Sequence, residues 1–221
     1  MKKFICAVLA LTLALSLAAC GGKTQETAPV ETAPAQELPA SALEILENVW
    51  ADYAEDEKFF VIGGSMNAPV DNAPGAFDLA DENLPYMLLV PADQMGSITE
   101  AASLIHAMNT NTFTCAAFKL AEGVTAADFG AAMKDAVLNN QWMCGFPDSL
   151  LIRALGDSYV VMAFGVNDAM TPFESHLTAV YPGMETIASE TIGLYKERQR
   201  SPPLPFLHHG APFGRAGTPK A

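Results

Sequence analysis

Cysteine is the residue type in this chain with the clearest chemical potential. Cys6 and Cys20 lie in an apolar N-terminal segment, whereas Cys115 and Cys144 lie in the body of the chain. In an exported domain the latter two could form a disulfide, closing a loop of about 30 residues worth ~3.5 kcal/mol in loop entropy. They could instead be small buried apolar side chains, or one could be a reactive thiol. No C-x-x-C pair occurs, so a thioredoxin-like redox motif is not predicted.

The histidines and one glycine-serine segment do not match known catalytic or metal-binding spacings. His106 stands in a β-like segment and His176 on an expected helix, and neither belongs to an H-E-x-x-H pattern. We interpret both as structural or surface histidines. The segment Gly63-Gly64-Ser65 does not complete G-x-S-x-G, so a turn is its expected role. Without a phosphate-binding glycine motif either, we predict no metal and no cofactor.

Two further groups of side chains could bind ligands. The first is an acidic cluster near the end of the first expected helix: Asp52, Glu55, Asp56 and Glu57. Hard cations prefer several carboxylates, but EF-hand spacing is missing and Tyr53 marks the opposite apolar side, so a solvated helix face is expected. The second is the pair Trp50 and Trp142, which could line a pocket but fall on apolar helix stripes. We therefore expect both tryptophans in the core.

The N-terminus has the features of a secretory leader. Lys2 and Lys3 precede residues 4–19, in which only Thr12 and Ser16 are polar. These sixteen residues make roughly 24 Å of helix. That is shorter than the ~30 Å hydrocarbon core, so a cleaved leader over residues 1–19 is expected rather than a permanent span.

The end of this leader, Leu17-Ala18-Ala19-Cys20, resembles the lipobox of bacterial lipoprotein precursors. The resemblance implies cleavage between Ala19 and Cys20, and a diacylglyceryl group on the Cys20 sulfur. Two or more acyl chains, such as palmitate, anchor a protein stably at ~0.8 kcal/mol per buried CH₂. The expected partner is therefore membrane lipid, and the expected location is the extracytoplasmic face of the cell membrane.

Composition divides the rest of the chain into a tether, a domain and a tail. Residues 20–40 are rich in Pro, Thr, Ala, Gln and Glu without aromatic residues, and residues 193–221 are basic and Pro-rich, so both are expected to be disordered. Residues 41–192 hold four basic and 21 acidic side chains, a net charge of −17, and the tail adds +4. Such an acidic chain excludes sequence-independent binding to nucleic acid.

Periodicity and turn signals predict an α+β fold for residues 41–192. A capping box at Ser41-x-x-Glu44 begins a helix over about 42–57. Strands are expected at 98–108, 113–121, 150–155 and 159–164, and further helices at about 126–142 and 172–181. The order is one N-terminal helix followed by two strand-strand-helix units. It predicts an antiparallel sheet with helices packed on one face.

The leader, the tether and this order of elements resemble small lipoproteins of gut Clostridia-type bacteria that carry a domain of unknown function. Asn140–Pro147 is the run most like that family, and the likeness extends over roughly residues 1–192. It brings no catalytic residues. We expect a membrane-anchored extracytoplasmic lipoprotein with a non-enzymatic binding or accessory role toward a protein, peptide or small ligand. The alternative is an extracytoplasmic enzyme or thiol protein that uses Cys115 or Cys144.

Overall fold

The computed structural model describes residues 38–108 and 111–192. Contacts divide the chain into Met1–Ala35 and Gln36–Ala221, and every described residue belongs to the second unit. The predicted leader, Ala19, Cys20 and the 193–221 tail lie outside the described residues, as does the tether up to residue 37.

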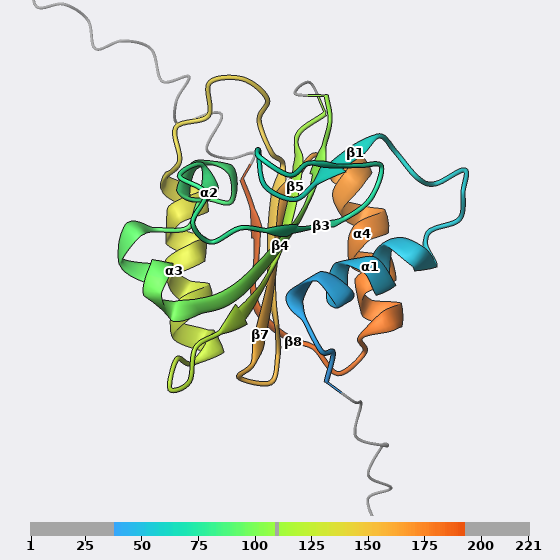
Figure 1. The fold of residues 1–221 in the computed structure, drawn as a ribbon. Coiled ribbons are helices and arrows are strands. Elements are labelled where there is room, and N and C mark those ends of the chain that lie inside the picture. The colour runs from blue at the N-terminus through green and yellow to red at the C-terminus, as the bar shows by residue number, and fades with distance from the viewer. Residues whose placement is uncertain (1–37, 109–110, 193–221) are drawn as a thin grey trace, which may run out of the picture. The chain divides into compact units, whose positions relative to one another are not determined.

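An antiparallel eight-stranded sheet forms the centre of the fold, with β2-β1-β4-β5-β7-β6-β8 in order and β3 paired with β4 (Figure 1). The strands are β1 (Val61–Gly63), β2 (Val70–Asp71), β3 (Gly75–Phe77), β4 (Ile98–His106), β5 (Phe113–Leu120), β6 (Ser149–Leu155), β7 (Tyr159–Gly165) and β8 (Glu185–Thr191). The alanine-rich β4 is a strand, as predicted, because it pairs with β5 over almost its whole length.

The helices are α1 (Ala42–Asp52), α2 (Leu84–Met87), the 3₁₀ helix η1 (Ala92–Ser97), α3 (Ala126–Asn139) and α4 (Asn167–Val180). Among these, only α1 and α3 begin at a residue whose side chain caps the helix. The Ser41 and Thr125 hydroxyls accept the N–H of Glu44 and Asp128, each at 3.1 Å. Helix α4 starts before the predicted Pro172, because the Val166 carbonyl already accepts helical N–H bonds. Pro172 lies inside α4 and, because it has no N–H, cannot bond the Asp168 carbonyl four residues before it.

Helices cover both faces of the sheet. The α+β class, the antiparallel sheet and the two strand-strand-helix units are confirmed, but the helices are not confined to one face as expected. Helices α1 and α4 pack on one face, and α3 with α2 packs on the other (Figure 1). In the strand order of the sheet, β6 lies two positions from β5, and β8 lies two positions from β7 in the same direction. Strands β5 and β7 themselves run antiparallel. Right-handed crossovers from such strands place α3 and α4 on opposite faces.

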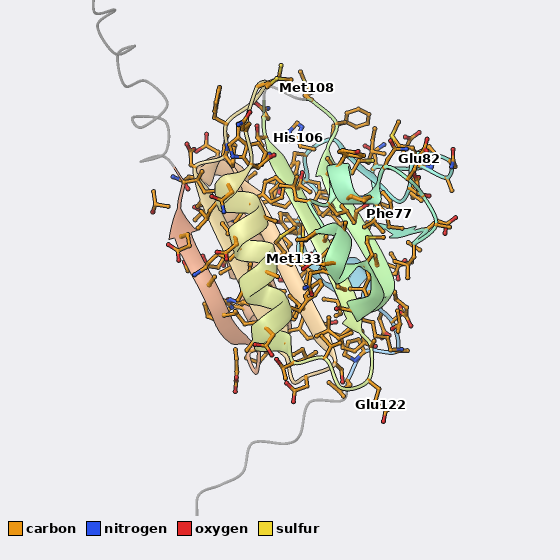
Figure 2. The ribbon with its side chains drawn as sticks, turned by 90° about the vertical axis from the view of Figure 1, so that its left-hand side faces the viewer. Phe77, Glu82, His106, Met108, Glu122 and Met133 are labelled. Atoms are coloured by element: carbon orange, nitrogen blue, oxygen red, sulfur yellow. The ribbon has the colours of Figure 1, made fainter. Side chains whose placement is uncertain are left out.

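The two ends of the sheet differ in what they carry. We call the end of the sheet at which the described chain begins the near end, and the opposite end the far end. At the near end, the Tyr159 hydroxyl donates to the Pro39 carbonyl at 2.8 Å. The far end holds His106 and Gly165, and β7 separates the two ends by about 20 Å. Figure 2 shows His106 and Met108 at one end and Glu122 at the other. None of the helices among the described residues is long and apolar enough to span a membrane.

Candidate functional site

A hollow of about 210 Å³ opens at the far end of the sheet. It is lined by residues from the loop after α1, the end of β4, the segment before β5 and the start of α4: Phe59, His106, Asn111, Val166, Asp168 and Ala169. Concave sites with aromatic walls and a few polar groups are the usual form of ligand sites. The hollow is therefore the candidate site.

Two other hollows are less suited to a ligand. One, of about 350 Å³, lies among near-end turns at residues 120–125 and 157–158. The other, of about 470 Å³, lies between the start of α1 and strands β3 and β4. Both carboxylates of its lining already have partners: Glu100 accepts the Ala42 N–H at 3.1 Å and the Lys119 ammonium at 2.8 Å, and Asp78 accepts the Ala80 N–H at 2.9 Å. Neither has an aromatic pair beside a titratable group in its lining.

The aromatic wall of the far-end hollow is a stacked pair. The Phe59 and His106 ring centroids are 5.2 Å apart, with an angle of 11° between the planes. Phe59 is held edge-on by Phe113 at 5.4 Å and by Trp50 at 5.5 Å. These contacts fix the ring without help from a ligand.

His106 is the neutral partner in this pair. Its Nδ1 accepts the Met108 N–H at 3.0 Å, which places the proton of the neutral ring on Nε2. Burial lowers the pKa of His106 below its ordinary 6.5. The imidazole is thus uncharged at neutral pH.

Asp168 is the charged group of the lining. It lies in the first turn of α4, where the helix N-terminus favours a carboxylate. The lining contains two ring faces, one carboxylate and one amide, and among its six residues there is no serine, cysteine, lysine or tyrosine to act as a nucleophile. These polar groups beside the rings could fix the orientation of a ligand.

Next to the hollow, His176 ties α4 to the end of α1. Its Nδ1 lies 2.8 Å from the Asp52 carboxylate, its Nε2 lies 3.6 Å from Glu57, and its ring stacks on Tyr53 at 3.9 Å. Two members of the predicted acidic cluster therefore contact a histidine, and a third, Glu55, pairs with Lys58. Within the described ranges no group of three or more His, Cys, Asp or Glu side chains is arranged to hold a metal ion.

The two cysteines of the domain are free, so the candidate Cys115–Cys144 disulfide is not present. Cys115 is fully buried among the residues that face α1 and α4, and burial raises its pKa well above the ordinary value. Cys144 is exposed in the loop after α3, which packs on the opposite face. The sheet therefore separates the two thiols, and the buried interpretation applies to Cys115 alone.

The remaining sequence candidates have structural roles. Gly64 has φ of +81°, and its backbone N–H and carbonyl both bond the buried Ser103 hydroxyl, at 3.0 and 3.3 Å. The predicted turn is displaced: Gly63 ends strand β1, and the hydrogen-bonded turn runs from Ser65 to Ala68, whose N–H donates to the Ser65 carbonyl at 3.0 Å. Trp50 is buried and donates its indole N–H to the Asn72 carbonyl, and Trp142 packs against Phe164.

Sequence reasoning considered His106 without assigning it to a site and missed Phe59, Asn111 and Asp168. These residues are far apart in the chain and meet only because the end of β4 and the starts of β5 and α4 lie together. Comparisons with protein-family models, with curated proteins and with solved structures gave no match for this chain. The site's own geometry must therefore indicate its use.

Proposed function

We propose that this protein is a membrane-anchored extracytoplasmic lipoprotein that binds a ligand, without catalysis, in the far-end hollow. The observation that carries the proposal is the convergence of Phe59, His106 and Asp168 on one concave site, whose described lining holds no serine, threonine, cysteine, lysine or tyrosine. The rings supply an apolar surface, and the carboxylate supplies a fixed polar contact.

The position of the hollow is consistent with an anchor at the N-terminus. The described chain enters at the near end, beside Tyr159, and the hollow lies about 20 Å away at the other end. If Cys20 carries lipid, the anchor is joined to the domain through its near end, and the hollow lies at the opposite end of the sheet.

The alternative, a thiol-based enzyme, loses one of its two candidate residues. Cys115 is fully buried and its thiol is kept protonated, so neither substrate nor base reaches it. Cys144 is exposed, and the alternative now depends on that residue alone.

The anchor is tested by mass spectrometry of the protein from its native membrane, together with membrane fractionation. We expect a chain that begins at Cys20 and carries acyl groups. A Cys20→Ser variant should leave the membrane fraction, whereas Cys144→Ser should stay. A Cys20 found unmodified in membrane-bound protein would overturn the anchor.

The binding site is tested by a thermal-shift screen of small amines, amino acids, sugars and carboxylic acids against the full chain in non-ionic detergent. Ligands that raise the melting temperature should lose their effect in Phe59→Leu. The matched control is Phe60→Leu, since Phe60 is half exposed and does not line the hollow. Shifts that survive Phe59→Leu unchanged would exclude the hollow as the site.

A further inference from the structure

All lysine and arginine side chains of the domain are paired with carboxylates. Each of the four lysine and arginine residues within 41–192 forms an ion pair with a carboxylate: Lys58–Glu55 at 2.7 Å, Lys119–Glu100 at 2.8 Å, Lys134–Glu190 at 3.9 Å and Arg153–Glu174 at 2.8 Å. Against these four stand 21 acidic residues. The described part of the domain thus leaves no lysine or arginine without a carboxylate partner, and its net negative charge concentrates cations near the surface.

The residues that line the hollow also favour a cation over an anion. Asp168 is the one carboxylate of its lining, and His106 adds no positive charge because its Nδ1 lone pair already accepts the Met108 N–H. Phe59 lines the same hollow as this carboxylate, and its ring is held in place by the stack on His106. A cation over an aromatic face gains ~0.5–1 kcal/mol at exposed sites, whereas an anion would meet Asp168 without a compensating charge.

The size of the hollow limits the ligand further. About 210 Å³ equals roughly seven water molecules at ~30 Å³ each. That space holds an ammonium or guanidinium group with a short carbon chain. It is smaller than the ~300 Å³ at which sites for drug-sized ligands begin.

We propose that the hollow binds a small organic cation, an ammonium or guanidinium group, held between the Asp168 carboxylate and the Phe59 ring. This inference rests on the proposed function, because it names the class of ligand for the same site. The carboxylate supplies the charge, and the ring supplies the flat apolar contact that a guanidinium plane prefers.

Such a cation has two sources, a free ligand or the chain itself. Strand β8 ends at the far end, where Thr191 pairs with Ser149 and the Ile192 N–H donates to the Asp148 carbonyl at 2.7 Å. The sequence that follows carries Arg198 and Arg200. The six residues from Ile192 to Arg198, and the eight from Ile192 to Arg200, span at most ~20–29 Å.

The test is isothermal titration calorimetry of the full chain in non-ionic detergent with N-acetylarginine methylamide. Its uncharged match is N-acetylcitrulline methylamide, which replaces the guanidinium by a urea of the same shape. We expect the arginine compound to bind at least about tenfold more tightly, and added salt to weaken it.

Asp168→Asn should weaken the arginine compound about fivefold or more, and Asp168→Glu should recover part of the loss. Asp135→Asn is the matched control, since it removes the same charge from an exposed site on α3 and should leave the affinity unchanged. Thermal unfolding of each variant checks the fold.

The source of the cation is tested by the same titration of a full-chain variant, in which five basic residues are replaced by glutamine: Lys196, Arg198, Arg200, Arg215 and Lys220. Tighter binding of the arginine compound would show that the chain's own tail competes for the hollow. Unchanged binding would assign the site to a free cation.

Equal affinities for the two compounds, no binding of either, or equal effects of Asp168→Asn and Asp135→Asn would overturn the cation inference. If the screen still finds a Phe59-dependent ligand of another class, the proposed binding function stands. If the screen also finds none, the proposed function fails with it.

Discussion

The Phe59 and His106 rings lie nearly parallel, 11° apart, with their centroids separated by 5.2 Å. This stack joins the loop after α1 to the end of β4. Its geometry depends on the uncharged imidazole, because Nδ1 accepts the Met108 N–H and cannot do so when protonated.

We expect His106 to make the protein less stable as the pH falls below about 6.5. Burial lowers its pKa in the folded state, so the unfolded chain binds more protons between the folded pKa and 6.5. Its stabilising contribution is therefore complete above about pH 6.5 and declines as the pH falls toward the folded pKa. Urea unfolding from about pH 5 to about pH 7.5 measures the slope of the free energy of unfolding against pH.

His106→Asn keeps an acceptor near the Nδ1 position but does not titrate, so it should flatten this slope. His176→Asn, which leaves His106 in place, should retain it. A slope unchanged by His106→Asn would contradict the assignment of a neutral His106.

The approach of β1 to β3 predicts a strong requirement for glycine at position 63. A Cβ on Gly63 would lie 2.2 Å from the Gly75 nitrogen and 2.5 Å from the Ala73 carbonyl oxygen, both of them backbone atoms. We expect Gly63→Ala to cost about 2–4 kcal/mol, measured by urea unfolding. Gly96→Ala is the control, since its Cβ meets nothing within 4 Å. Equal midpoints for the two variants would exclude the close contact.

Local signals in the sequence predicted the long helices α1, α3 and α4 and the four strands β4 to β7, but not β1, β2, β3 or β8. The caps at Ser41 and Thr125 and the hairpin turn around Gly156 act within a few residues, so they can be identified without tertiary information. The sequence also contains a local indication that helices cover both faces of the sheet, which the prediction did not use. Strands β5 and β7 are apolar along nearly their whole length, which is typical of strands buried on two faces.

The candidate site could not be predicted in the same way. Phe59 follows an acidic helix end, His106 closes a strand and Asp168 opens a helix, and each has an ordinary local explanation. Only the pairing of Val61 with His106, and the bond from the Val166 N–H to the Thr112 carbonyl, bring them together. Similarly, the side of the sheet on which Cys115 lies depends on strand register.

Two buried tyrosines should respond in opposite ways to loss of their hydroxyl groups. The Tyr53 hydroxyl is buried without a hydrogen-bond partner in the described structure, whereas the Tyr181 hydroxyl accepts from the Asn48 amide at 3.0 Å. Tyr53→Phe should therefore leave the free energy of unfolding unchanged or raise it by up to about 1 kcal/mol. Tyr181→Phe should lower it by about 0.5–1.5 kcal/mol. A clear loss in Tyr53→Phe would indicate a partner for its hydroxyl.

The two free cysteines should differ in their rate of reaction with a thiol reagent such as Ellman's reagent. Cys144 is exposed and should react at once in the folded protein, whereas Cys115 should react only as fast as the domain opens. Cys144→Ser should remove the fast phase, and Cys115→Ser should remove the phase that appears in denaturant. If both thiols stayed unreactive in denaturant until a reductant was added, the cysteines would be bonded. That result would contradict their separation by the sheet.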